Sequence, residues 1–212
     1  MSPSRQTSEV FADIWCSFAH IGLGTVAAQR AAAGRDDIVI VVRSWPLELV
    51  NGLPMSADKT HEHIIELQEF VAPDAFVGFD AQQFPTTTLE ALALVARAYR
   101  TSLELGERAS FRVRDALFEE GRNVGDHTVI AELAAELGIG LPDDTDRSQV
   151  LHDWEEGRQR GVIGSPHFFA NGHDVFCPSL HIERGDHGLT IHSNAQTLEH
   201  FLQQHALVTS PN

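Results

Sequence analysis

The sequence predicts an α/β fold in which the two ends of the chain form one β-sheet and a helical block lies between them. Three observations support this fold: strand-type segments enclose a helix near the N-terminus, residues 55–160 have low strand propensity, and a β-hairpin pattern returns after residue 160. Strands at both ends of an all-helical middle are typical of two sequence-distant halves of one sheet. A length of 212 residues fits one such domain with a large insertion.

The first half of the sheet is predicted from residues 9–44. Residues 9–15 are rich in β-branched and aromatic side chains, and residues 37–44 form a nearly continuous apolar run, as in a strand buried on both faces. Helix-forming residues lie between them from Cys16 to Arg30, and Gly34 is expected to end that helix. A strand, a helix and a strand in this order predict a βαβ unit with parallel strands.

The middle of the chain is predicted to be helical. After a loop at residues 45–54, helices are expected at residues 56–71, 86–98, 107–119, 126–137 and 145–160. Each begins at a capping or turn residue. The expected breaks between the helices are Gly106, Gly121, Gly138 and Pro142.

The second half of the sheet is predicted after residue 160. Asn171 and Gly172 separate two short apolar runs, which is a strong hairpin signal. Two weak strands around a turn are expected at 177–193, followed by a last helix from Asn194 to about His205. The predicted domains are therefore an α/β core of residues 8–54 and 161–207 and a helical insertion of residues 55–160.

The charge balance argues against two classes of partner. The formal net charge is −15, and such an acidic surface repels nucleic acids and anionic membrane surfaces. No apolar run reaches the roughly 18 residues of a transmembrane helix. The first seven residues contain no apolar signal-peptide core, so we expect a cytoplasmic protein.

Cys16 is the main candidate for a catalytic residue. It lies between a predicted strand end and a predicted helix start, where unpaired N–H groups and the helix dipole favour an anion. The pKa of its thiol is therefore expected below the free value of about 8.5, and the thiolate is the nucleophile. His20, one turn later, can approach this thiolate and serve as a general acid or base. The alternatives are a buried core cysteine and a histidine without a catalytic part.

Two segments together carry a resemblance to a known family. DIWCSFAHIG, residues 13–22, places a cysteine at a strand–helix junction, and GVIGSPHF, residues 161–168, places Pro166 at the mouth of a strand, where we expect a cis peptide bond. With the helical insertion between them, the chain resembles the DsbA family of thioredoxin-fold proteins, especially its FrnE-like cytoplasmic branch. The resemblance implies a thioredoxin-like core in which Pro166 faces Cys16 and the Ser165 backbone pairs with a substrate or with glutathione.

The chain departs from this family at one position. Redox members carry Cys-x-x-Cys, whereas the second cysteine is replaced here by Ala19. Cys16 is then left to act as a monothiol with an external small thiol, or with Cys177 as an unconventional partner. From the sequence, we expect no Cys16–Cys177 bond under mild oxidation.

Two alternatives follow from the same resemblance. Kappa-class glutathione transferases and hydroxychromene-carboxylate isomerases are similar to this fold and use a single Ser or Cys to activate a bound thiol, a role that Cys16 or Ser17 would fill here. The chain would otherwise be a catalytically inactive protein that binds a peptide or small ligand. A buried Cys16, or a raised pKa of its thiol, would favour this last alternative.

The sequence-based hypothesis is a DsbA-like thiol oxidoreductase. Cys16 and His20 are the expected catalytic residues, and the expected substrate-binding residues are Ser17, Phe18, Ser165 and Pro166. We expect no tightly bound cofactor, with glutathione or another small thiol as the co-substrate, and a small disulfide or a peptide as the substrate. The histidines of residues 167–192 match zinc-ligand spacings only loosely, so we predict no metal site.

Overall fold

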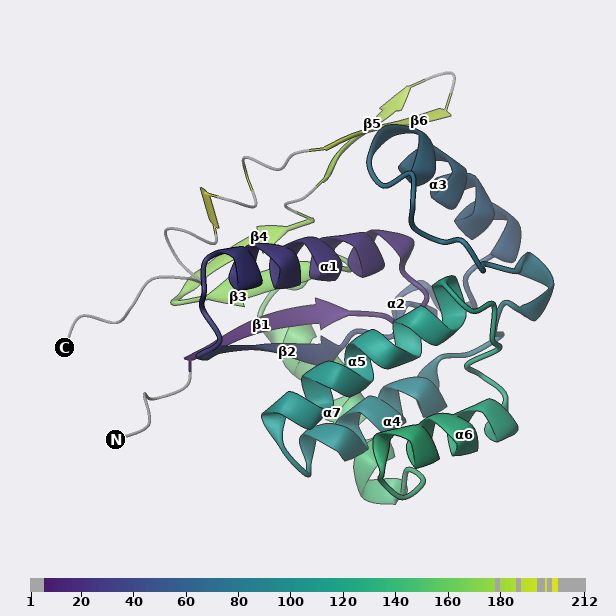
Figure 1. Ribbon diagram of the computed structural model, residues 1–212, viewed down its shortest axis with the longest axis vertical. Helices are drawn as coiled ribbons and strands as arrows, with labels where there is room; N and C mark the ends of the chain where they lie inside the picture. The colour runs from purple at the N-terminus through teal and green to yellow at the C-terminus, as the bar shows by residue number, and fades with distance from the viewer. Residues whose placement is uncertain (1–5, 178–179, 186–187, 194–196, 198–199, 202–212) are drawn as a thin grey trace.

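The computed structural model describes residues 6–177, 180–185, 188–193, 197, 200 and 201. It confirms the α/β fold, with a mixed sheet and helices that follow one another between its two halves (Figure 1). The elements in chain order are β1 (Gln6–Ala12), α1 (Ser17–Ala32), β2 (Ile38–Ser44), α2 (Leu47–Asn51), α3 (Ala57–Phe70), the 3₁₀ turn η1 (Ala81–Gln83), α4 (Leu89–Tyr99), α5 (Leu103–Phe118), α6 (His127–Leu137), α7 (Asp144–Gln159), β3 (His167–Ala170), β4 (His173–Phe176), β5 (Leu180–Gly185) and β6 (Gly188–Ser193).

The main sheet has the strand order β2-β1-β3-β4. β1 and β2 are parallel, as the predicted βαβ unit requires, and β1 pairs antiparallel with β3 through Val10 and Phe168. The two ends of the chain therefore meet in the β1–β3 pair. β5 and β6 form a separate two-stranded sheet. The turn between β3 and β4 has positive φ at Asn171 and Gly172, which explains the Asn-Gly pair found in the sequence.

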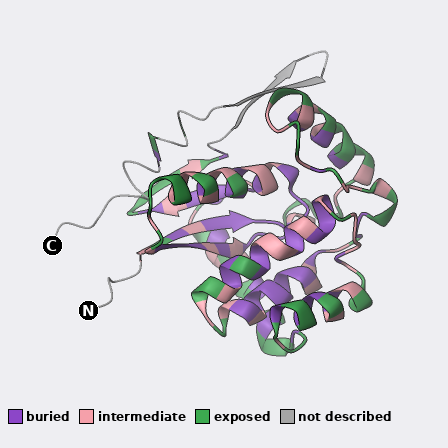
Figure 2. Ribbon diagram, viewed as in Figure 1, coloured by how far each residue is buried: buried purple, intermediate pink, exposed green. Residues whose placement is uncertain are grey.

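Apolar side chains pack on both faces of the main sheet. α1 covers the face that carries Val10, Ile40 and Phe168, and its Leu23 belongs to the same cluster. Phe11 lies on the other face, with Trp45 and Val162. Figure 2 shows the buried residues on the strands and on the inward sides of the helices. Among the described residues, no helix is both long and apolar enough to cross a membrane.

Three predicted boundaries are wrong, each for a local reason. β1 ends at Ala12 rather than at residue 15, because the Asp13 N–H donates to Ser165 Oγ instead of to a neighbouring strand. The loop predicted at 45–54 contains the short helix α2. Gly106 lies inside α5 and does not break it, because α5 begins one turn earlier, after Ser102, whose side chain accepts a hydrogen bond from the backbone N–H of Leu105.

The helical block covers the free edge of the sheet at β2. The backbone N–H groups of Ile40, Val42 and Ser44 donate to side chains, and their acceptors are Glu107 Oε2 at 2.9 Å, Tyr99 Oη at 2.7 Å and Asp153 Oδ2 at 3.1 Å. The Tyr99 hydroxyl also donates to the Ile40 carbonyl at 3.0 Å. These side chains replace the missing neighbouring strand, so the edge strand presents few free groups to another chain.

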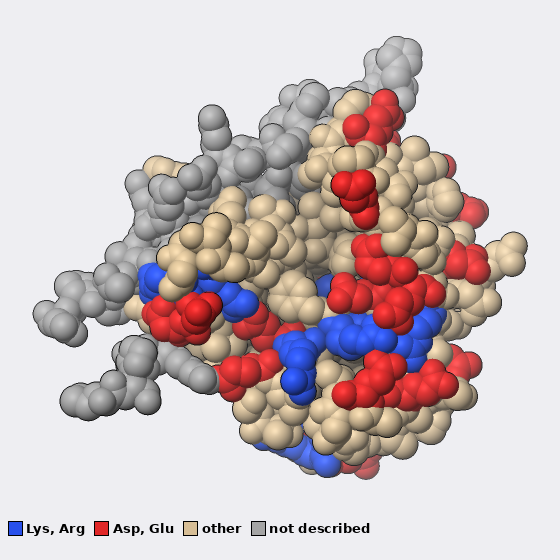
Figure 3. All heavy atoms as spheres, in the orientation of Figure 1, with Lys and Arg blue, Asp and Glu red and all other residues tan. Residues whose placement is uncertain are grey.

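The surface seen in Figure 3 carries a band of basic side chains with acidic ones on both sides. Within the described residues, Arg112 and Arg122 each form ion pairs with Glu120 and Glu136. The helix predicted at 194–205 lies mostly outside the described residues, although Thr197, His200 and Phe201 are helical and Phe201 is buried.

Candidate active site

Cys16 lies at the junction that the sequence predicted. It is the N-cap residue of α1, with an extended backbone, and the α1 helix begins at the next residue. Its side chain is only 4% exposed, and Sγ donates a hydrogen bond to the Ser165 carbonyl oxygen at 3.1 Å. Cys16 and Ser165 are 149 positions apart, and the β1–β3 pairing brings them together.

The loop that faces Cys16 is held in place from both sides. The Ser165–Pro166 peptide bond is cis, as predicted. The Asp13 N–H donates to Ser165 Oγ at 3.0 Å. On the other side, the Ile163 N–H donates to His167 Nδ1 at 3.4 Å, and His167 Nε2 lies 2.9 Å from Asp174 Oδ2. These contacts hold the His167 ring between the backbone of Ile163 and the Asp174 carboxylate.

The protonation state of Cys16 differs from the sequence expectation. Burial raises the pKa of the Cys16 thiol above its usual range, and it outweighs the side chain of Ser165, which acts in the opposite direction. Loss of water disfavours the thiolate more than the helix N-terminus stabilises it. The expectation of a lowered pKa is therefore wrong, and the resting side chain is a protonated thiol that donates to a carbonyl.

A buried pair of charged residues, Asp13 and Arg114, lies beside Cys16. The Asp13 carboxylate accepts hydrogen bonds from the backbone of Ile14 and Leu47 and from the Thr88 hydroxyl at 2.7 Å. Arg114 donates to the Asp13 carbonyl oxygen at 3.0 Å and to Ser110, one turn earlier on α5. The negative charge of Asp13 raises the pKa of the Cys16 thiol, and the positive charge of Arg114 lowers it.

Burial shifts the pKa of both charged groups. It raises the pKa of Asp13 from 3.8 to about 6, and it lowers the pKa of Arg114 to about 10. Neither residue is among the site residues predicted from the sequence. A carboxylate inside the apolar run of residues 9–15 was a usable signal for Asp13, because charged residues are rarely buried without partners. Arg114 has no such signal, since its helix resembles any other amphipathic helix with a solvated face.

His20 lies near Cys16 in the chain, but its side chain contacts residues of α5 and of the loop before η1. Its backbone N–H donates to the Cys16 carbonyl oxygen as part of α1. Its Nε2 lies 2.8 Å from Glu119 Oε1, and its ring packs against Phe76 and Phe118. Glu119 also accepts from the backbone N–H groups of Phe76 and Val77. The pair therefore ties α1 to the end of α5 and to the loop before η1.

The other predicted substrate-binding residues surround Cys16 at different depths. Ser17 and Pro166 are buried, and Ser165 is also nearly inaccessible. Phe18 is half-buried, and its ring lies 5.1 Å from the ring of His63 on α3. Phe18 therefore packs against α3.

Cys177 follows β4 and joins the loop from the side opposite Cys16. Its backbone N–H donates to the Pro166 carbonyl oxygen at 2.9 Å, and its φ of 43° is in the left-handed region. Burial, together with the nearby Cys16, raises the pKa of its thiol to about 12. Both cysteines are free thiols.

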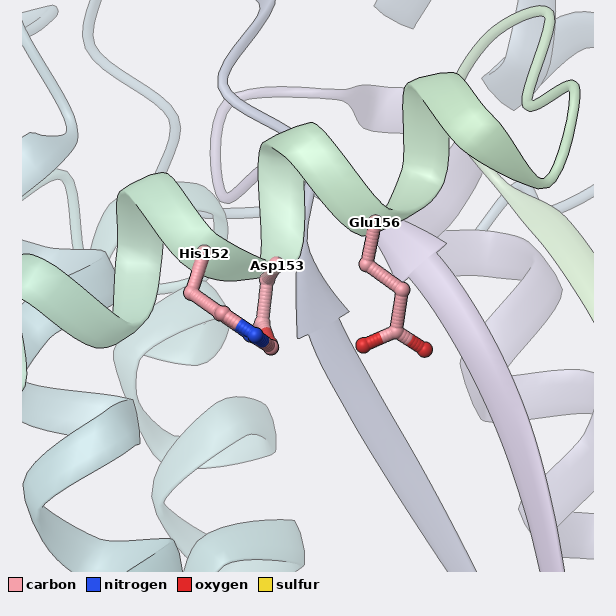
Figure 4. A group of neighbouring side chains, drawn as sticks. All are labelled: His152, Asp153 and Glu156. Atoms are coloured by element: carbon pink, nitrogen blue, oxygen red, sulfur yellow. The ribbon is translucent and has the colours of Figure 1, made fainter.

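One group of metal-ligand residues lies on α7, distant in sequence from Cys16. His152, Asp153 and Glu156 have ligand atoms within 4.8 Å of one another (Figure 4). Arg43 already pairs with both carboxylates, at 3.2 Å from Asp153 and in closer contact with Glu156. A metal ion would have to displace this guanidinium, so the group is better described as an ion-pair network. Of the histidines at 167–192, those at 181, 187 and 192 have side chains outside the described part of the chain.

A cavity of about 290 Å³ lies between β2 and the helices α4 and α7. Tyr99, Arg43 and Asp153 are among its lining residues, whereas Cys16 and the Ser165–Pro166 loop are not. The predicted site and this cavity are therefore separate features.

Comparison with known proteins places the chain in a family. A family model described as a DSBA-like thioredoxin domain matches residues 7–184. No curated protein sequence matches significantly. Similar solved structures include a probable DsbA oxidoreductase from Streptomyces coelicolor, with 19% identity, a TM-score of 0.68 and coverage of 98% of this chain and 93% of that one.

Two other similar structures carry different activities in their names. The cytosolic disulfide reductase DsbM from Pseudomonas aeruginosa, in a structure with GSH, has 18% identity, a TM-score of 0.60 and coverage of 93% of this chain and 98% of that one. A 2-hydroxychromene-2-carboxylate isomerase has 13% identity, a TM-score of 0.60 and coverage of 81% of this chain and 88% of that one. At these identities the likeness establishes a shared fold. With the family model matching most of its length, the chain belongs to the DsbA-like thioredoxin-domain family.

Proposed function

We propose that this protein is a thiol–disulfide oxidoreductase whose reacting group is the thiol of Cys16. The observation that carries the proposal is the position of Cys16 Sγ, at the start of α1 and 3.1 Å from the Ser165 carbonyl oxygen. A disulfide docked against the Ser165–Pro166 loop would present its sulfur atoms to this side chain at short range. Membership in the DsbA-like family supports this class of chemistry.

The buried, protonated state of Cys16 sets the expected direction of exchange. A thiolate that is destabilised in the folded protein does not stabilise the reduced form, in contrast to strongly oxidising members of the superfamily. We therefore propose that the protein reduces a small-molecule or peptide disulfide. A small thiol such as glutathione would regenerate Cys16, and the cytoplasm supplies such thiols.

The test is the formation of a mixed disulfide with hydroxyethyl disulfide at pH 9. The product is read by intact-mass spectrometry. Cys177→Ser removes the other buried cysteine and is the matched control for Cys16→Ser. We expect Cys177→Ser to gain one hydroxyethylthio group and Cys16→Ser to gain none on Cys177. Equal adducts on both variants would refute the assignment of Cys16. No adduct on folded Cys177→Ser would leave the non-catalytic alternative, which the burial of Cys16 favours.

One observation favours a second candidate function. The Cys16 S–H is a hydrogen-bond donor that burial keeps protonated, and such a donor can stabilise the thiolate of a bound small thiol. Cys16→Ser separates the two functions, because a serine hydroxyl can still donate a hydrogen bond but cannot exchange disulfides. Glutathione binding by calorimetry that survives in Cys16→Ser, with no disulfide exchange in the wild type, would favour this second function.

A further inference from the structure

We propose that Cys177 is the second redox residue of the site, which resolves the mixed disulfide on Cys16 by forming a Cys16–Cys177 disulfide across the Ser165–Pro166 loop. This inference rests on the proposed function and supplies the partner thiol that Ala19 does not provide. It reverses the expectation from the sequence that no Cys16–Cys177 bond forms. The two cysteines are separated by 160 residues, so the sequence alone does not indicate that they lie at the same loop.

The backbone contacts place the two cysteines on the two sides of one short loop. Cys16 Sγ donates to the carbonyl oxygen of Ser165, and the Cys177 N–H donates to the carbonyl oxygen of Pro166. The carbonyl groups of two consecutive residues are therefore engaged by the two cysteines. The strand register agrees, because His167 pairs with Phe11 on one side and with Phe176 on the other.

The two side chains lie in two apolar clusters that share neighbours. Cys177 belongs to the cluster that includes Ile14 and Trp15, Cys16 belongs to the cluster beneath α1, and Phe18 and Leu47 pack against both. Each cysteine side chain is at most 5% exposed. The charge of a Cys16 thiolate acts on the Cys177 thiol, as expected for two groups in one buried region.

Cys177 also lies directly after the edge strand of the sheet. β4 is a short edge strand whose residues are mostly exposed, and the left-handed φ of Cys177 turns the chain as the strand ends. A non-glycine residue in this region of φ is uncommon.

The chemistry balances with a substrate disulfide as the oxidant. The Cys16 thiolate attacks one substrate sulfur, the substrate S–S bond breaks, and the first thiol leaves after taking a proton from solvent. The Cys177 thiolate, after losing its proton to solvent, attacks Sγ of Cys16, and the second substrate thiol leaves in the same way. Two electrons pass from the two cysteines to the substrate, and two equivalents of a small thiol restore the reduced protein.

The experiment treats the full chain with hydroxyethyl disulfide and follows both protein mass and released thiol. We expect the wild type to lose two hydrogen atoms in mass and to release two thiols per chain, whereas Cys177→Ser keeps one adduct and releases one. Peptide mapping of the wild type should yield a Cys16–Cys177 cross-linked peptide. Cys177→Ala repeats the measurement with a side chain that cannot donate a hydrogen bond.

The outcomes separate the two proposals. A wild-type protein that keeps one stable adduct on Cys16, as Cys177→Ser does, would refute the role of Cys177 and leave monothiol exchange standing. No adduct on either Cys177 variant would refute the proposed function itself, and the inference with it. The wild-type peptide map tests the Cys16–Cys177 disulfide even where a Cys177 variant is poorly folded. A map without the cross-linked peptide would refute the role of Cys177.

Discussion

The buried carboxyl of Asp13 gives the sharpest quantitative prediction. Its side chain is fully buried, and its pKa is raised from 3.8 to about 6 because burial outweighs the hydrogen bonds that it accepts. A carboxyl whose pKa is raised in the folded state contributes stability below the unfolded value, and that contribution is lost as the pH rises through about 6. A difference of about two pKa units corresponds to about 3 kcal/mol.

The perturbation is Asp13→Asn, which removes the titration and keeps the shape of the side chain. The free energy of unfolding of each protein is measured by urea denaturation at several pH values. Between about pH 4.5 and pH 7.5, the variant should gain about 2 kcal/mol relative to the wild type, the part of the full effect that falls in this range. Every other carboxylate cancels in the difference, as does any fixed effect of the amide group on the local hydrogen bonds.

Asp37→Asn is the matched control with the opposite sign. The guanidinium of Arg35 holds the pKa of Asp37 below its usual range, so this variant should lose stability relative to the wild type as the pH rises through the range where the unfolded carboxyl ionises. The difference in free energy of unfolding between the wild type and Asp13→Asn should therefore change with pH. A difference that stays constant within about 0.5 kcal/mol across the pH range would refute the interpretation of Asp13 as a buried, desolvated charge.

Three further predictions concern the site and the block that supports it. The rate of Cys16 alkylation, read by peptide mass spectrometry, should rise through a midpoint above the free-thiol value of about 8.5, and a midpoint below it would contradict the effect of burial. Tyr99→Phe removes both hydrogen bonds to β2 and should lower the free energy of unfolding by about 1–3 kcal/mol in urea, whereas an unchanged midpoint would mean that water replaces them. Gly106→Ala places Cβ 2.0 Å from the Tyr99 ring and should cost about 1–3 kcal/mol. Gly24→Ala, in open space on α1, should instead stabilise by up to about 1 kcal/mol, and equal effects of the two variants would contradict this packing.

Local patterns in the sequence were sufficient for most of the secondary structure. Ser56, Asp126 and Asp143 accept hydrogen bonds at the starts of α3, α6 and α7, which is the short-range capping chemistry that a sequence reveals directly. The hairpin at Asn171 follows from the same kind of local rule. Gly106 shows where such rules fail, since a glycine that makes room for a tyrosine of the preceding helix looks the same in the sequence as one that ends a helix.

The sequence by itself determined the α/β class, the position of Cys16 at the start of a helix and the loop at Pro166, because each depends on neighbours in the chain. Only the tertiary structure decided the chemistry of that position. The pKa of Cys16 depends on how much water remains around it and on the charges of Asp13, just after β1, and of Arg114 on α5. The nearness of Cys177 depends on the strand order of the sheet. Solvent exclusion and long-range charge are properties of the packed molecule, so no local pattern of residues encodes them.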